Sequence, residues 1–217
     1  MNFAVARANM VDSQLRTNKV ADAALLEAFL AVPRERFVPV AFHDTAYFDD
    51  DLPLGNGRVM LEPMVLARLL EAARIGGGDK VLDIGCTSGY GAAILARLAA
   101  VVVAVEEDSA LARDARARLA ELGVLHAAIV EAPLVEGHAA EAPYDAIVIE
   151  GGVAHIPDAI AAQLAEGGRL VTIVRAGAGM GRATLMTRVN GVLSHRPLFD
   201  AAAPFLPGFA RAPHFVF

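Results

Sequence analysis

The chain has 217 residues, of which 55% are hydrophobic and 20% are charged, so it can bury one substantial core. Its formal net charge is −6 and it has no basic block, which disfavours nucleic-acid binding because such binding depends on neutralising phosphates. Its apolar runs are too short to span a bilayer, and its first residues lack the pattern of a signal peptide. Cys86 is the only cysteine, so no internal disulfide can form, and we expect a cytoplasmic protein.

The N-terminal part is expected to form two helices followed by an irregular segment. Residues 4–17 and 21–32 have apolar side chains at helical spacing. Between residues 33 and 58, prolines and glycines predict turns, and we expect Arg34 to lie at the surface or to pair with a nearby acid. The three aspartates at 49–51 predict a solvated loop and no metal site, because consecutive carboxylates cannot all face one ion.

From residue 63 onward, the pattern is that of a sheet with helices. Pro63 suits the first turn of a helix, and glycines at 76–78 end it. Short apolar runs then alternate with helical stretches, which is typical of a parallel sheet covered on both faces. The expected strands are 80–84, 101–105, 127–130, 146–149 and 169–174, and the expected helices are 90–98, 110–122 and 158–164. Asn190-Gly191 lies between two further apolar runs and predicts a two-residue hairpin turn.

These elements predict a single α/β domain with a doubly wound, mostly parallel sheet that ends in an antiparallel hairpin. Residues 61–217 would form a cofactor-binding core, and residues 1–60 would add N-terminal helices and loops. The C-terminal aromatic residues are expected to pack on the sheet or to form a subunit contact; they are Phe199, Phe205, Phe209, Phe215 and Phe217.

The segment from Lys80 to Tyr90 reads KVLDIGCTSGY, a strand, a glycine turn and a helix start. Gly85 has no Cβ, so the backbone can turn sharply and approach a ligand, and the helix after Gly89 offers unpaired N–H groups. The turn is neither a dinucleotide fingerprint nor a P-loop, and it would also suit an ordinary strand-to-helix connection. The candidate cofactor contacts here are Asp83, Gly85, Cys86, Thr87, Ser88 and Gly89. We interpret Cys86 as a small residue that fills the turn.

Glu106 follows the next strand, about 20 residues after the glycine turn, where an acidic side chain holds a ribose through its hydroxyls. A carboxylate accepts both hydroxyl protons, so it suits a diol. Glu106, Glu107 and Asp108 could equally form a plain polar turn. With no dinucleotide fingerprint present, the two motifs together favour S-adenosylmethionine as the cofactor.

The chain resembles the protein-L-isoaspartate (D-aspartate) O-methyltransferases, which are class I S-adenosylmethionine-dependent methyltransferases with a Rossmann-like fold. The resemblance covers nearly the whole chain and rests on the segments AVPRERFVP, DLPLGNG, VLDIGCTSGYGAAILA, APYDAIVI and HIPDAIAAQLAEGGRLV. It implies methylation of the free carboxylate of isoaspartyl residues in damaged proteins. It also implies a protein or peptide acceptor. We further expect no nucleic-acid or membrane partner, and a monomer or homodimer.

One departure from the family pattern falls on the substrate loop. The family has Q-T-I-S-x-P where this chain has RVMLEP, so Leu61 replaces the active-site serine and Val59 the threonine. An acceptor carboxylate is already ionised, so methyl transfer needs alignment and exclusion of water and not a general base. Arg58 could pair with that carboxylate, or Glu62 could neutralise Arg58. The candidate substrate-loop residues are Arg58, Leu61 and Glu62.

Two further departures concern the cofactor side. Pro133 stands where the family has the acid of G-D-G, and Glu131 lies near it. The fourth strand ends in a carboxylate, Glu150. Glu107, Glu131 and Glu150 therefore complete the candidate cofactor contacts. His155 is either a base for another kind of acceptor or a histidine at a helix entry. The alternatives to the isoaspartyl reaction are a methyltransferase with a different acceptor and a non-catalytic regulatory homologue.

Overall fold

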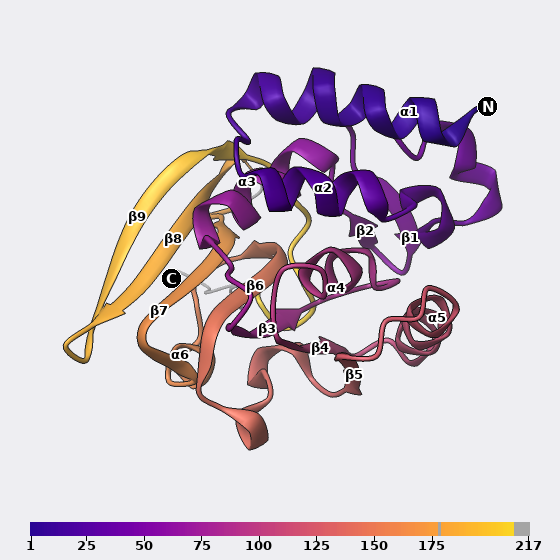
Figure 1. The fold of residues 1–217 in the computed structure, drawn as a ribbon. Coiled ribbons are helices and arrows are strands. Elements are labelled where there is room, and N and C mark those ends of the chain that lie inside the picture. The colour runs from indigo at the N-terminus through magenta and orange to yellow at the C-terminus, as the bar shows by residue number, and fades with distance from the viewer. Residues whose placement is uncertain (178, 211–217) are drawn as a thin grey trace, which may run out of the picture.

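The computed structural model describes residues 1–177 and 179–210 of the chain. Its centre is a seven-stranded sheet in the order β5-β4-β3-β6-β7-β8-β9 (Figure 1). Strands β3 to β7 are parallel, and β8 and β9 complete the sheet as an antiparallel hairpin. The strands are β3 (Lys80–Ile84), β4 (Val101–Glu106), β5 (Ala127–Glu131), β6 (Tyr144–Val153), β7 (Leu164–Val174), β8 (Gly181–Val189) and β9 (Val192–Ala201). The predicted doubly wound sheet with a terminal hairpin is confirmed.

The central strands form because they are apolar along their whole length, as strands buried on both faces must be. In β3, Val81, Leu82 and Ile84 are all completely buried. Asp83 is the one polar residue among them, and its backbone pairs with Ala104 on one side and with Val148 on the other. The sheet thus carries a carboxyl group in its interior, next to the glycine turn.

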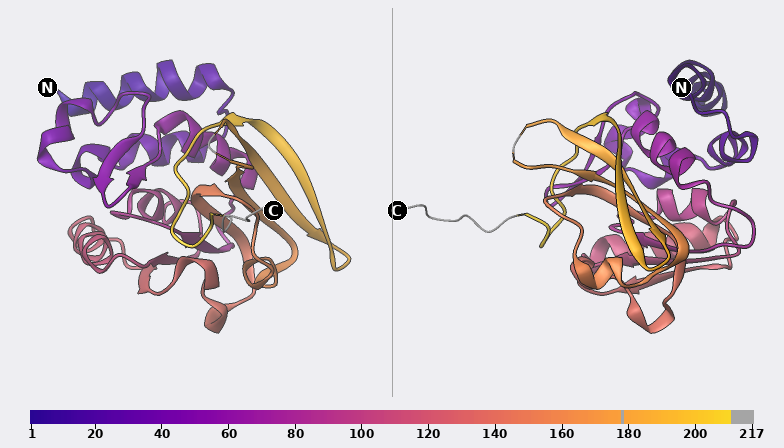
Figure 2. Two further views of the ribbon diagram at one scale, coloured as in Figure 1. Left: turned by 180° about the vertical axis from the view of Figure 1, so that it is seen from behind. Right: turned by 90° about the vertical axis from the view of Figure 1, so that its left-hand side faces the viewer.

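Helices cover the sheet, and the N-terminal ones form a further layer along one side of the molecule (Figures 1 and 2). The helices are α1 (Phe3–Met10), α2 (Ala23–Ala31), α3 (Pro63–Ala73), α4 (Tyr90–Leu95), α5 (Ser109–Glu121) and α6 (Asp158–Ala161). Short helical turns occupy Val11–Leu15, Arg16–Asn18, Arg34–Phe37, Val40–Thr45, Leu134–Glu136 and Ala139–Glu141. Figure 2 shows the long β8–β9 hairpin at one side of the molecule.

Several predicted boundaries differ from the structure. Helix α4 ends at Leu95 rather than at residue 98, and β6 covers Tyr144–Val153 rather than residues 146–149. The helix expected at 158–164 ends at Ala161, and β7 starts at Leu164 rather than at residue 169. The reason is a backbone pairing between Tyr144 and Leu164 that extends the parallel ladder between β6 and β7. Local periodicity does not report such a partner, so the extension had no signal in the sequence.

The irregular segment before α3 contains a small antiparallel hairpin, β1 (Leu52–Gly55) with β2 (Arg58–Met60). Asn56 and Gly57 form its turn with φ values of 50° and 73°. Two positive φ values suit the turn that matches the twist of a hairpin, which explains the Asn-Gly pair. This hairpin holds Arg58 over the carboxyl edge of the sheet.

Arg34 is completely buried, so its expected position at the surface is wrong. Its Nε donates to the carbonyl of Ala46 and its Nη2 to the carbonyl of Leu61, each at 2.7 Å. Its guanidinium also lies 4.9 Å from the centre of the Tyr90 ring. Arg34 therefore ties the loops on either side of the β1–β2 hairpin to the start of α4.

The remaining expectations for the described residues concern membranes, metals and the aromatic tail. No helix in this part of the chain is both long and apolar enough to cross a membrane. The same residues contain no group of three or more His, Cys, Asp or Glu side chains that could hold a metal ion. Phe209 is buried, and the ring of Phe199 lies 3.7 Å from the guanidinium of Arg68. Phe215 and Phe217 lie outside the described residues.

Candidate functional site

Three buried carboxyl groups mark the carboxyl edge of the sheet. The strand order reverses between β3 and β6, and ligands of open α/β sheets bind in the crevice at such a point. Asp83 comes from β3, Glu106 from the end of β4 and Glu150 from β6, and their exposed fractions are 0%, 0% and 3%. Burial of a carboxylate is costly unless it is paired, so each of these groups needs a partner or a proton.

The glycine turn shapes the floor of this crevice. Gly85 and Gly89 have φ values of 80° and 90°, which side chains with a Cβ rarely adopt. The N–H groups of Gly85 and Cys86 donate to the carbonyl of Val105, which fixes the turn against β4. Burial raises the pKa of the Cys86 thiol, so the thiol stays protonated and serves as a packing group.

The hydroxyl groups of the turn point in different directions. Ser88 donates from Oγ to the carbonyl of Phe37 at 2.6 Å, so its side chain contacts the N-terminal extension. Thr87 has a buried hydroxyl with no hydrogen-bond partner among the described residues. Of the two, only Thr87 has a side-chain polar atom left to bind a ligand.

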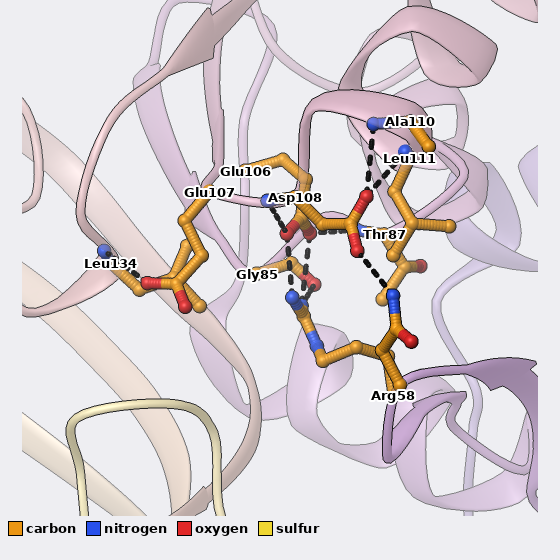
Figure 3. Close-up of polar contacts among 10 residues, drawn as sticks. Arg58, Gly85, Thr87, Glu106, Glu107, Asp108, Ala110, Leu111 and Leu134 are labelled. Carbon is orange, nitrogen blue, oxygen red and sulfur yellow. Dashed lines mark hydrogen bonds and ion pairs between the residues drawn. The ribbon is translucent and has the colours of Figure 1, made fainter.

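Glu106 forms a bidentate ion pair with Arg58 (Figure 3). Arg58 donates from Nη1 to Oε1 at 2.5 Å and from Nη2 to Oε2 at 2.9 Å. The N–H groups of Asp108 and Thr87 donate to the same two oxygens at 3.0 Å and 2.9 Å. Both oxygens of the predicted ribose-binding carboxylate therefore already accept two hydrogen bonds each.

Asp83 and Glu150 form no ion pair with any described residue. Both Asp83 oxygens and Oε1 of Glu150 are buried without a hydrogen-bond donor in the described part of the chain. Burial raises the pKa of Asp83 well above its usual value, and the neighbouring Glu150 raises it further. Burial raises the pKa of Glu150 to about 7, against the lowering effect of its contact with Asp83. Burial thus favours the protonated forms of both groups in the free protein, and a cation placed beside them would favour their ionised forms.

The other predicted site residues lie outside this group. The carboxylate of Glu131 faces α5, where Ser109 donates to it and Arg116 lies 4.0 Å away. Glu107 accepts a 3.4 Å hydrogen bond from the N–H of Leu134. Leu61 is completely buried in the core.

Glu62 and His155 likewise do not reach the crevice carboxyls through any contact in the described structure. Glu62 donates its N–H to Asp51, and partial burial raises the pKa of its side chain to about 7. His155 is exposed.

Leu206 is a residue of the crevice that the sequence did not indicate. Its N–H donates to the carbonyl of Gly152 at 3.0 Å, so residues 203–209 run beside the end of β6. The nearest carbon of its side chain lies 3.1 Å from the position that a Cβ on Gly85 would take, and 2.6 Å from the corresponding position on Gly151. The glycine at 151 was visible in the sequence, but the segment that fills the space beside it was not.

Two cavities open near the ends of the sheet. One, of about 310 Å³, lies next to the ion pair and is lined by Asn56, Arg58, Glu107, Asp108 and Pro207. The other, of about 270 Å³, is lined mainly by residues of α3 and β9, among them Arg68, Glu71 and Phe199, and contains none of the predicted site residues. The first cavity therefore lies beside the Arg58–Glu106 side of the candidate site.

The stability of the free protein is expected to fall as the pH rises from about 4.5 to about 7, because folded Glu150 holds its proton more tightly than the unfolded chain does. The loss is at most about 1.4 kcal/mol per pH unit for this group. Urea unfolding at a series of pH values would measure it. The Glu150→Gln variant should show a flatter profile, and an unchanged profile in that variant would contradict the assignment.

The chain was then compared with known proteins. The family model described as protein-L-isoaspartate(D-aspartate) O-methyltransferase matches residues 6–199. The protein-L-isoaspartate O-methyltransferase 1 of Rhodopseudomonas palustris is 41% identical over 189 residues, which are 87% of this chain and 77% of the relative. The protein-L-isoaspartate O-methyltransferase of Koribacter versatilis is 43% identical over 169 residues, 78% of this chain and 76% of the relative.

Solved structures agree with this match. A protein-L-isoaspartate O-methyltransferase superposes with a TM-score of 0.82 at 25% identity, covering 93% of this chain and 66% of the other. A second structure, from Plasmodium falciparum and in complex with S-adenosyl-L-homocysteine, has a TM-score of 0.78 at 18% identity, covers 94% of this chain and 97% of the other, and shows the shared fold. The predicted fold, O-methyltransferase class and S-adenosylmethionine cofactor are confirmed. The chain belongs to the protein-L-isoaspartate(D-aspartate) O-methyltransferase family.

Proposed function

We propose that this protein transfers the methyl group of S-adenosylmethionine to the free carboxylate of isoaspartyl residues in damaged proteins. The observation that carries the proposal is the set of buried carboxyl groups around the glycine turn, in a chain of this family. A cytoplasmic location, with cytoplasmic proteins as acceptors, is part of the proposal.

The residues of the crevice fit the cofactor. S-adenosylmethionine supplies an activated methyl group on a positively charged sulfur and carries an ammonium group nearby. Asp83 and Glu150 have buried carboxyl oxygens without a donor, as groups that receive a cation require. Glu106 stands at the strand end that holds a ribose, and Gly85 allows close approach of the ligand.

The protein would contribute alignment and a dry environment to the reaction. The acceptor carboxylate is already ionised, so no side chain has to remove a proton from it. Once a cationic cofactor lies beside them, Asp83 and Glu150 would ionise, and their attraction to it would be strong because water is excluded from the site. Leu61 is buried and has no polar group, so pairing with the acceptor carboxylate would fall to Arg58 of the same loop.

The test is a methyl-release assay with an isoaspartyl peptide, with the matching aspartyl peptide as control. We expect methanol release that depends on the isoaspartyl linkage, because the ester formed beside the peptide N–H is labile. Binding of S-adenosylhomocysteine, measured in parallel by calorimetry, identifies a folded and competent protein. Binding without isoaspartyl-dependent methylation would exclude this acceptor.

A further inference from the structure

The ribose of the cofactor and Arg58 need the same two oxygen atoms. Each oxygen of Glu106 already accepts one bond from the Arg58 guanidinium and one from a backbone N–H. The backbone donors belong to Thr87 and Asp108, in the glycine turn and next to Glu106, and both are fixed by the fold (Figure 3). Only Arg58 can leave to make room for two ribose hydroxyls.

Arg58 is held by a small hairpin and not by the sheet. β2 has three residues and pairs only with β1. Besides the Arg58–Glu106 pair, one further side-chain hydrogen bond joins the hairpin to the end of β4: Nδ2 of Asn56 donates to Asp108 at 2.9 Å. The cavity of about 310 Å³ beside Arg58 gives the guanidinium space to turn away from Glu106.

The acids that line the cavity beside Arg58 are Asp108 and Glu107, and Glu107 accepts a 3.4 Å hydrogen bond from the N–H of Leu134. A released Arg58 would lose its ion-pair partner, Glu106. Its only other hydrogen bond among the described residues goes to the carbonyl of Gly85 at 3.3 Å, and its side chain is 4% exposed. Asp108 is occupied by Asn56 and by the N–H groups of Ala110 and Leu111. A buried cation without a partner is strongly unfavourable, so a carboxylate that arrives next to it is bound.

We propose that Arg58 exchanges partners during the reaction: it pairs with Glu106 in the free protein and with the acceptor carboxylate once the cofactor ribose has taken Glu106. The exchange makes acceptor binding depend on prior cofactor binding. It also lowers cofactor affinity, because only the fraction of molecules with Arg58 released can bind. The second half of this proposal rests on the proposed function, whereas the competition for Glu106 does not.

Three variants test the exchange. Arg58→Gln removes the competing charge, and Arg58→Lys keeps the charge but cannot form the bidentate pair. Arg113→Gln is the matched control, since it makes the same change at an arginine of α5 whose side chain is 75% exposed. Calorimetry measures S-adenosylhomocysteine binding to each variant, and thermal unfolding with and without the ligand verifies that each is folded.

We expect Arg58→Gln to bind S-adenosylhomocysteine about tenfold more tightly than the unaltered protein. This factor corresponds to the free energy of about one charge-assisted hydrogen bond, which the ligand no longer has to displace. Arg58→Lys should fall between the two, and Arg113→Gln should match the unaltered protein. A stable Arg58→Gln or Arg58→Lys protein with weaker or equal binding would overturn the competition.

The second arm measures isoaspartyl-peptide binding with and without S-adenosylhomocysteine. In the unaltered protein, the ligand should strengthen peptide binding about tenfold or more, and in Arg58→Gln this coupling should disappear. Equal coupling in the two proteins would mean that Arg58 turns to another acid, such as Glu107, and would overturn the exchange. If the unaltered protein binds S-adenosylhomocysteine but no isoaspartyl peptide, the proposed function is wrong. The binding measurements of the first arm still decide whether Arg58 and the ligand compete for Glu106.

Discussion

Replacing Glu106 with alanine should weaken S-adenosylhomocysteine binding at least tenfold and lower the free energy of unfolding by about 3–5 kcal/mol. Binding falls because the ribose hydroxyls lose a charged acceptor. Stability falls because Arg58, 4% exposed, is left as a buried charge without a counterion. Calorimetry and urea unfolding measure the two effects separately.

A double variant separates the two causes. Glu106→Ala combined with Arg58→Met removes both charges, so most of the lost stability should return while cofactor binding stays weak. If the single Glu106→Ala variant is as stable as the unaltered protein, the buried ion pair does not have the energetic role assigned to it. If affinity is unchanged, Glu106 does not bind the ribose.

Arg34→Met should lower the free energy of unfolding by about 2–5 kcal/mol, because two buried carbonyl groups lose their donor. These are the carbonyls of Ala46 and Leu61, each 2.7 Å from the guanidinium. The contact with the Tyr90 ring is lost as well. Since Tyr90 is the first residue of α4, the glycine turn before it should also become less protected from hydrogen exchange.

The matched control for Arg34→Met is Arg36→Met, from the same helical turn. The side chain of Arg36 is 44% exposed and pairs at the surface with Glu121, which is 60% exposed. Exposed pairs contribute about 0–1 kcal/mol, so this variant should unfold almost like the unaltered protein. Urea unfolding of both variants is the measurement, and equal losses would refute a special role for the buried arginine.

The sequence predicted those parts of the site that are coded by neighbouring residues. Gly85 directly follows a buried strand, Gly89 precedes the next helix, and Glu106 ends the next strand, so local pattern and spacing were sufficient. The Arg58–Glu106 pair joins residues 48 positions apart. Leu206 reaches Gly85 from an even more distant segment. Neither contact produces a periodic pattern in the sequence. The position of the crevice could therefore be predicted, but the side chains that occupy it, Arg58 and Leu206, could not.

The two Asn-Gly pairs show how context limits a local signal. Asn190-Gly191 was recognised as a turn because strands of nine and ten residues flank it. Asn56-Gly57 has flanking strands of only four and three residues, too short to show alternation. The buried position of Arg34 was missed for a related reason, since the carbonyls that it satisfies belong to loops, and loop carbonyls have no pattern in the side chains.

The single cysteine gives the glycine turn a natural chemical reporter. Cys86 is completely buried and its thiol is held protonated, so a thiol reagent can reach it only when the turn opens. With no other cysteine in the chain, labelling is stoichiometric and needs no engineered site. The labelling rate, followed by absorbance or mass, therefore measures how often the turn opens. This measurement does not require a known substrate.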